Sequence, residues 1–169
     1  LACAALPVPV AELSAHLEQL STAPGRTSPL LGTRDQFNVD IRATVDGQLA
    51  GATTIIRRYA AVGVSASEVD NGRVKGLFYQ PASVTGIPVV VVAGPGGGAW
   101  RDAPALLASR GHPALAVAYF TYPGLSASLE SVPIETFAEA NRWLSERTGA
   151  ARVAMLGVSR GTEAVQLTA

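Results

Sequence analysis

Four consecutive valines constrain the fold of this chain more than any other feature of its sequence. The run occupies residues 89–92 and leads directly into a loop of glycines and one proline at residues 94–98. A strand that is apolar at every position has to be covered on both faces, which is typical of a strand in a parallel sheet. The run therefore predicts an α/β protein in which helices cover both faces of a sheet.

Strand and helix patterns alternate from this run to the end of the chain, which implies right-handed βαβ connections and a mostly parallel sheet. The expected elements are a helix that begins at Asp102 as its cap and ends at Arg110-Gly111, a strand at 114–119, a helix at about 131–147, a strand at 152–156 and a helix at 160–169. In the longer helix the spacing predicts a buried face made of Ile134, Phe137, Ala138 and Leu144.

The chain before residue 87 has the pattern of antiparallel β structure. Apolar and polar residues alternate over residues 37–45, which is the period of a half-buried strand. Asp46-Gly47 follows at once and favours a tight hairpin turn, so residues 48–58 should return antiparallel. Asn71-Gly72 repeats this signal between a strand near Val69 and a strand at residues 74–79.

These patterns divide the chain into two expected parts. Apolar residues at helical spacing predict a short amphipathic helix over residues 10–20. Residues 1–62 would hold this helix and a sandwich-like antiparallel β region. Residues 63–169 would form the α/β part.

Composition excludes several classes of function. Hydrophobic residues make up 48% of the 169 residues, so the chain can build a core. Thirteen basic residues balance thirteen acidic ones without forming blocks, so we expect no nucleic-acid partner and favour a small-molecule substrate. We expect no transmembrane segment, because no apolar run approaches the roughly 20 residues that span a bilayer. Neither a cofactor nor a metal site is predicted, and the oligomeric state is left open.

The first residues bear on the cellular compartment. The chain starts at Leu1 rather than Met, so we expect a processed, trimmed or partial chain. Leu1-Ala2-Cys3 fits the tail of a secretory or lipoprotein signal, and an apolar tether is the alternative. Cys3 is the only cysteine, which excludes an internal disulfide. A cytoplasmic location is favoured.

The motif with the most chemistry is Gly157-Val158-Ser159-Arg160-Gly161, which matches G-x-S-x-G. An expected strand precedes it and an expected helix follows it, as a nucleophile elbow requires. Gly157 and Gly161 would permit the sharp turn that exposes the Ser159 hydroxyl. The amide of Arg160 would then face the substrate oxygen that gains negative charge. The alternative is an ordinary turn between a strand and a helix.

The glycine loop at residues 94–98 has two functional interpretations. Its spacing fits a dinucleotide fingerprint, but the acidic residue expected about twenty positions later is missing at residues 119–121. We favour a loop that offers a second amide to the oxyanion, from Gly96 or Gly97, as in esterases. A close-packed turn without a ligand is the third possibility.

A serine nucleophile needs a base, and in this kind of enzyme the acid and the histidine follow the serine along the chain. Ser159 has only ten residues after it, so we expect the acid and the base beyond Ala169 and the chain to be a fragment. His16 and His112 are expected to be surface or packing residues. Asp102 is better explained as a helix cap than as a catalytic acid.

Several segments together resemble one family of proteins, the acyl-CoA thioesterases and bile acid-CoA:amino acid N-acyltransferases. The segments are residues 69–81, 94–98, 106–119, 134–144 and 157–161, and the similarity spans about residues 64–169. The resemblance implies an incomplete α/β-hydrolase fold behind a β-sandwich, and a coenzyme A thioester as substrate. It also implies that Ser159 takes up the acyl group. Serine is similar to the hydrolytic members, whereas conjugating members typically use cysteine.

We therefore expect a serine acyl hydrolase that cleaves an acyl-CoA thioester through an acyl-enzyme on Ser159. The alternatives are a dienelactone-hydrolase-like carboxylesterase, an acyl-CoA:amino acid N-acyltransferase, and an inactive fragment or binding module. A nucleotide-binding domain is the most distant alternative.

Overall fold

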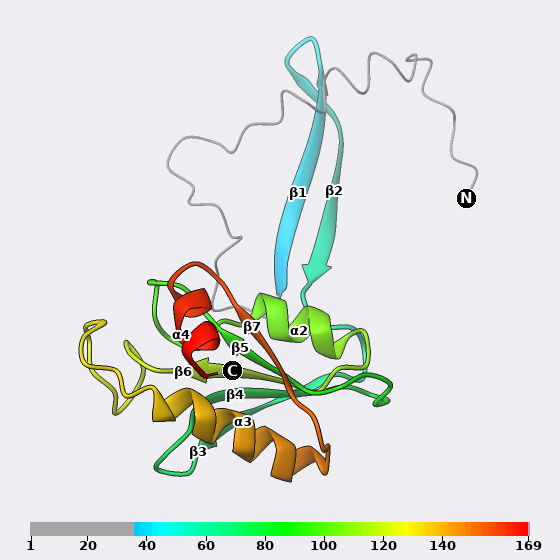
Figure 1. The fold of residues 1–169 in the computed structure, drawn as a ribbon. Helices are drawn as coiled ribbons and strands as arrows, with labels where there is room; N and C mark the ends of the chain where they lie inside the picture. The colour runs from blue at the N-terminus through cyan, green and yellow to red at the C-terminus, as the bar shows by residue number, and fades with distance from the viewer. Residues whose placement is uncertain (1–35, 169) are drawn as a thin grey trace. The chain divides into compact units, whose positions relative to one another are not determined.

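The computed structural model describes residues 36–168 and places them in two separate sheets (Figure 1). One sheet has two strands, β1 (Gln36–Val45) and β2 (Gln48–Arg58). The other has five strands in the order β3-β4-β6-β5-β7. The expected helix at residues 10–20, Cys3 and His16 lie outside the described residues, and the expected division near residue 62 stays a prediction.

The first hairpin has the turn that its sequence predicts. Val45 pairs with Gln48, and the two residues between them both have positive φ, 50° at Asp46 and 77° at Gly47. The expected half-buried strand is wrong in one respect, because Ile41 is 43% exposed and Val45 63% exposed. The strand and its return form as predicted, but the described residues of this region form one two-stranded sheet. Residues 36–168 add no second layer to this two-stranded sheet, so they leave its apolar face exposed.

The five-stranded sheet is mixed. β6 (Ala114–Ala118), β5 (Val89–Val92) and β7 (Ala154–Gly157) are parallel neighbours. β4 (Lys75–Gln80) pairs antiparallel with β6 on one side and with β3 (Ser65–Asp70) on the other. β4 thus runs against the other strands, which all share one direction, so the expected mostly parallel sheet is confirmed.

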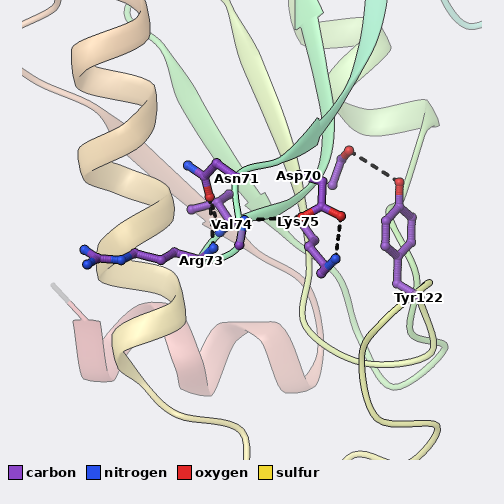
Figure 2. A network of polar contacts seen from close by, with 8 residues as sticks. Asp70, Asn71, Arg73, Val74, Lys75 and Tyr122 are labelled. Carbon is purple, nitrogen blue, oxygen red and sulfur yellow. Dashed lines mark hydrogen bonds and ion pairs between the residues drawn. The ribbon is translucent and has the colours of Figure 1, made fainter.

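The connection between β3 and β4 differs from the predicted two-residue turn. Asp70 pairs with Lys75, so the loop has four residues, and only Gly72 among them has a positive φ, 83°. The side-chain oxygen of Asn71 accepts hydrogen bonds from the amides of Arg73 (3.0 Å) and Val74 (2.7 Å), as Figure 2 shows. Asn71 therefore stabilises the turn through its side chain, as Asx turns do, rather than through a left-handed backbone.

A small polar network holds this loop next to the segment after β6. The Lys75 ammonium pairs with the Asp70 carboxylate at 2.5 Å, and the Tyr122 hydroxyl donates to the carbonyl of Gly76 at 3.4 Å (Figure 2). The hydrogen bond from Lys75 lowers the pKa of Asp70 below its usual value, and the Gly72 amide adds to this effect. The contact from Tyr122 thus joins the start of β4 to the segment after β6.

Helices cover both faces of the five-stranded sheet, as expected. α2 (Asp102–Ala108) packs on the face that carries Ala114 and Ala116, whose small side chains allow a close approach. α3 (Glu135–Thr148) and α4 (Arg160–Thr168) pack on the opposite face, together with Leu115 and Val117. The valine run is fully covered, because β5 is buried at every position. Among residues 36–168 the structure has no helix that is both long and apolar enough to span a bilayer.

Two helix predictions need correction. α3 begins at Glu135 rather than near residue 131, because Ser131 has a φ of 51°, which is incompatible with a right-handed helix. Its buried face consists of Phe137, Ala140 and Leu144, whereas Ala138 is exposed.

The cap of α2 also differs from the prediction. Asp102 is the first helical residue, and its carboxylate accepts from the neighbouring amide of Ala103 at 2.9 Å. The helix ends at Ala108, and Gly111 has the expected left-handed φ, 87°, three residues later.

Candidate active site

Ser159 lies in a sharp turn at the carboxyl end of a parallel strand. β7 ends at Gly157 and α4 begins at Arg160, so only two residues connect them. The φ of Ser159 is 53°, in the left-handed region that residues with a side chain rarely occupy. Its side chain is exposed, and its hydroxyl forms no hydrogen bond with the part of the chain that the structure describes. A strained, exposed serine between a strand and a helix is the geometry of a nucleophile elbow.

The two glycines of the motif are required by space. A Cβ atom at Gly157 would lie 2.6 Å from the carbonyl oxygen of Gly161. A Cβ atom at Gly161 would lie 2.3 Å from the carbonyl oxygen of Val92 and 2.6 Å from that of Ala93. The first turn of α4 therefore packs directly on the carboxyl end of β5, and neither position tolerates a side chain without a shift of the backbone.

The backbone amide of Arg160 lies at the amino end of α4, where helix amides lack acceptors within the helix. The next two amides of α4 are engaged, because Gly161 donates to Val158 and Thr162 donates to Ser159, each at 2.9 Å. The amide of Arg160 is at the first helical residue, which has no intrahelical acceptor. The positive end of the helix dipole lies at the same place. A developing negative charge next to Ser159 would be stabilised there.

The glycine loop reaches the serine through Gly94. A Cβ atom built at Gly94 would lie 3.2 Å from the Cβ and 3.8 Å from the Oγ of Ser159. Gly97 has a φ of 67° and packs on Thr121, and the amide of Gly98 donates to the carbonyl of Phe120 at 2.9 Å. Gly96 is exposed, and no atom comes within 4 Å of a Cβ built there.

The loop is thus fixed at both ends and open at Gly96. This arrangement leaves the amide-donor role of Gly96 or Gly97 a prediction.

Sequence reasoning missed Tyr119, which holds the start of the glycine loop. Its hydroxyl donates to the carbonyl oxygens of Ala93 (2.6 Å) and Gly94 (3.2 Å). Its ring packs against Phe120 and Phe137, with centroids 5.0 and 5.2 Å apart. Burial raises the pKa of the Tyr119 phenol, which therefore stays protonated and able to donate. The signal that could have revealed it is its position directly after β6, the strand beside β5.

The order of the strands explains why these two loops meet. The loop after β5 leads to α2 on one face of the sheet, whereas the loop after β7 leads to α4 on the other face. The carboxyl ends of neighbouring parallel strands whose connections diverge in this way form a topological switch point, where ligands bind in open α/β sheets. Residues 94–98 and Ser159 flank this point.

The described histidine is far from the serine along the sheet. Nδ1 of His112 donates to the carbonyl of Ile87 at 2.9 Å, just before β5 begins. Val89 and Ala154 pair at that amino end of the strands, whereas Val92 and Gly157 pair at the end that leads to Ser159. His112 is therefore a packing residue, as expected, and is not placed to act as the base.

Comparison with known proteins places the chain beside enzymes of acyl-CoA metabolism. It is 32% identical to human mitochondrial acyl-coenzyme A thioesterase 2 over 120 residues. This matched stretch makes up 69% of this chain and 25% of the relative. It is 33% identical to human acyl-coenzyme A thioesterase 1 over 110 residues, 63% of this chain and 26% of the relative. It is 37% identical to mouse bile acid-CoA:amino acid N-acyltransferase over 92 residues, 54% of this chain and 22% of the relative.

These relatives confirm the family resemblance that the sequence motifs predicted. No family model matches the chain. The chain spans about a quarter of the length of the curated relatives it matches.

Proposed function

We propose that this chain supplies the nucleophile and the oxyanion-binding loop of an α/β-hydrolase-type enzyme that hydrolyses acyl-CoA thioesters. The observation that carries the proposal is the turn at Ser159. It combines a left-handed φ of 53°, an exposed side chain, the amino end of α4 and the adjacent Gly94. The similarity to acyl-CoA thioesterases supports the substrate class.

In the proposed reaction, Oγ of Ser159 attacks the thioester carbonyl carbon while its proton passes to a general base. The carbonyl oxygen becomes an oxyanion, which the amides of Arg160 and of Gly96 or Gly97 would stabilise. The tetrahedral intermediate collapses, the bond between carbon and sulfur breaks, and the coenzyme A thiolate takes up the proton. Water then attacks the acyl-enzyme by the same steps, and the carboxylic acid leaves with Ser159 restored.

The base and its acidic partner are proposed to come from outside residues 36–168. Within residues 36–168 the single histidine, His112, is held at the amino end of the strands. The carboxylate of Asp102 accepts a hydrogen bond from the amide of Ala103 at the start of α2. The proposal therefore requires that the catalytic histidine reach Ser159 from a segment outside residues 36–168.

The test is acylation of the full-length protein with a radiolabelled long-chain acyl-CoA, followed by peptide mass spectrometry and a thiol-release assay. We expect acyl mass on the peptide that contains Ser159, and release of coenzyme A that falls about 10³-fold or more in Ser159→Ala. Ser126→Ala is the matched control, because Ser126 is another exposed serine in a loop. Thiol release that Ser159→Ala leaves intact would exclude the proposal, and a preference for oxygen esters would favour a carboxylesterase.

Acyl transfer to an amino acid is the second candidate. The 37% identity to mouse bile acid-CoA:amino acid N-acyltransferase favours it. Both reactions share the acyl-enzyme and differ in the group that attacks it. Formation of an N-acyl amino acid when glycine is added to the acyl-CoA assay, at the expense of free acid, would identify the transferase.

A further inference from the structure

We infer that Tyr119 is a positioning residue that sets the glycine loop at the correct distance from Ser159, an inference that rests on the proposed function. It does not contact the substrate. It acts through two successive carbonyl oxygens, those of Ala93 and Gly94, which both accept a hydrogen bond from its hydroxyl.

The carbonyl group of Ala93 lies in a crowded position. The carbonyl oxygen of Ala93 accepts from Tyr119 at 2.6 Å, and the same oxygen would lie 2.6 Å from a Cβ at Gly161. Gly94, the next residue, packs on Ser159. The backbone at Ala93 and Gly94 therefore contacts Tyr119 on one side and the turn around Ser159 on the other.

The phenol of Tyr119 is held rigidly in the core. Tyr119 is 8% exposed, and its ring is enclosed by Phe120 and by Phe137 of α3. A buried aromatic ring with two such neighbours has little rotational freedom, so its hydroxyl occupies a fixed position. The hydrogen bond thus links the glycine loop to the rigid core rather than to another loop.

The glycine loop has to hold its amide donors in place. Oxyanion donors stabilise the transition state only when they are held in place before the reaction, and small displacements cost rate. Gly96 is exposed, and no atom comes within 4 Å of a Cβ built there, so packing at Gly96 does not hold its amide in place. Anchors at both ends hold it: Tyr119 at Gly94, and the bond from Gly98 to Phe120.

The experiment compares Tyr119→Phe with wild type in the full-length protein. Dissociation constants are measured for two ligands, an acyl trifluoromethyl ketone that forms a tetrahedral adduct with Ser159 and an unreactive thioether analogue of acyl-CoA. We expect Tyr119→Phe to weaken ketone binding about tenfold, to leave thioether binding within about twofold, and to lower kcat with little change in KM.

Two variants separate the hydrogen bond from packing. Leu144→Val loosens the same buried core but keeps the Tyr119 hydroxyl and both of the aromatic rings beside it, and Tyr122→Phe removes a hydroxyl that bonds the carbonyl of Gly76 instead. Both should leave the ratio of the two dissociation constants unchanged, even where Leu144→Val lowers the Tm.

Two outcomes would overturn the inference, and they are distinguishable from a failure of the proposed function. An unchanged ratio in Tyr119→Phe, or an equal change in Leu144→Val, rejects the role of Tyr119 while Ser159 acylation stands. If wild-type Ser159 is never acylated, the proposed function fails and the role of Tyr119 fails with it.

Discussion

Gly161 in α4 lies directly against the carbonyl oxygen of Val92 at the end of β5. A Cβ atom at Gly161 would be 2.3 Å from that oxygen, closer than any real Cβ contact. The contact explains why the motif around Ser159 needs a glycine at this position. It also couples the start of the helix to the strand that carries the glycine loop.

Gly161→Ala should therefore destabilise the fold. The added methyl group meets backbone atoms that cannot rotate away, so β5 and α4 must separate. We expect a loss of about 1–3 kcal/mol or more in the free energy of unfolding, measured by urea denaturation. Gly51→Ala is the control, because nothing lies within 4 Å of a Cβ at that position. Equal stability of Gly161→Ala and wild type would contradict the contact.

Truncation of Leu115 in β6 should destabilise the fold, because this side chain lies in the core. It is fully buried with Val90, Val92 and Leu144 around the same cluster. Leu115→Ala removes apolar contact and leaves a cavity, so the free energy of unfolding should fall by about 2–5 kcal/mol. Leu49→Ala, at a position that is 62% exposed, should change it by about 0.5 kcal/mol or less. Similar losses in both variants would show that Leu115 is not packed as described.

Tyr119 should make stability depend on pH in alkaline solution. Burial raises its pKa above the ordinary value of 10.0, so the folded state keeps the phenol proton after the unfolded chain has lost it. The stabilising contribution is complete below pH 10.0 and is lost as pH rises through the higher folded-state pKa. In chemical denaturation between pH 9 and 11, wild type should therefore lose stability more steeply than Tyr119→Phe. Parallel curves would mean that the phenol is not buried.

Sequence patterns predicted the elements that local chemistry decides. The turn at Asp46-Gly47, the covered valine run and the strand–serine–helix order around Ser159 all follow from neighbours in the chain. The turn at Asn71 is also local, but it differs from the predicted one. The asparagine side chain accepts a hydrogen bond from the amide of Val74, which takes the place of a left-handed backbone at Asn71.

Features that depend on distant contacts could not be predicted in this way. The choice of Ala140 over Ala138 for the buried face of α3 depends on how the helix packs against the sheet, which the spacing within the helix does not show. The bond from Tyr119 to Ala93 joins residues 26 positions apart, and it requires the order of the strands. The exposed hairpin shows that alternation indicates which residues share a face, not whether that face is covered.

Gly94→Ala should separate activity from stability at the candidate site. Gly94 has no positive φ, and its added methyl group would lie 3.2 Å from the Cβ and 3.8 Å from the Oγ of Ser159, which is crowded rather than impossible. We expect the Tm to fall by only a few degrees, whereas kcat for acyl-CoA should fall about tenfold or more, because the methyl group occupies space beside the nucleophile. Gly161→Ala is the contrasting variant, since its main effect should be a loss of stability. A Gly94→Ala protein with full activity would show that the carbonyl carbon of the substrate approaches Ser159 from another side. The loop at residues 94–98 would then not belong to the proposed site.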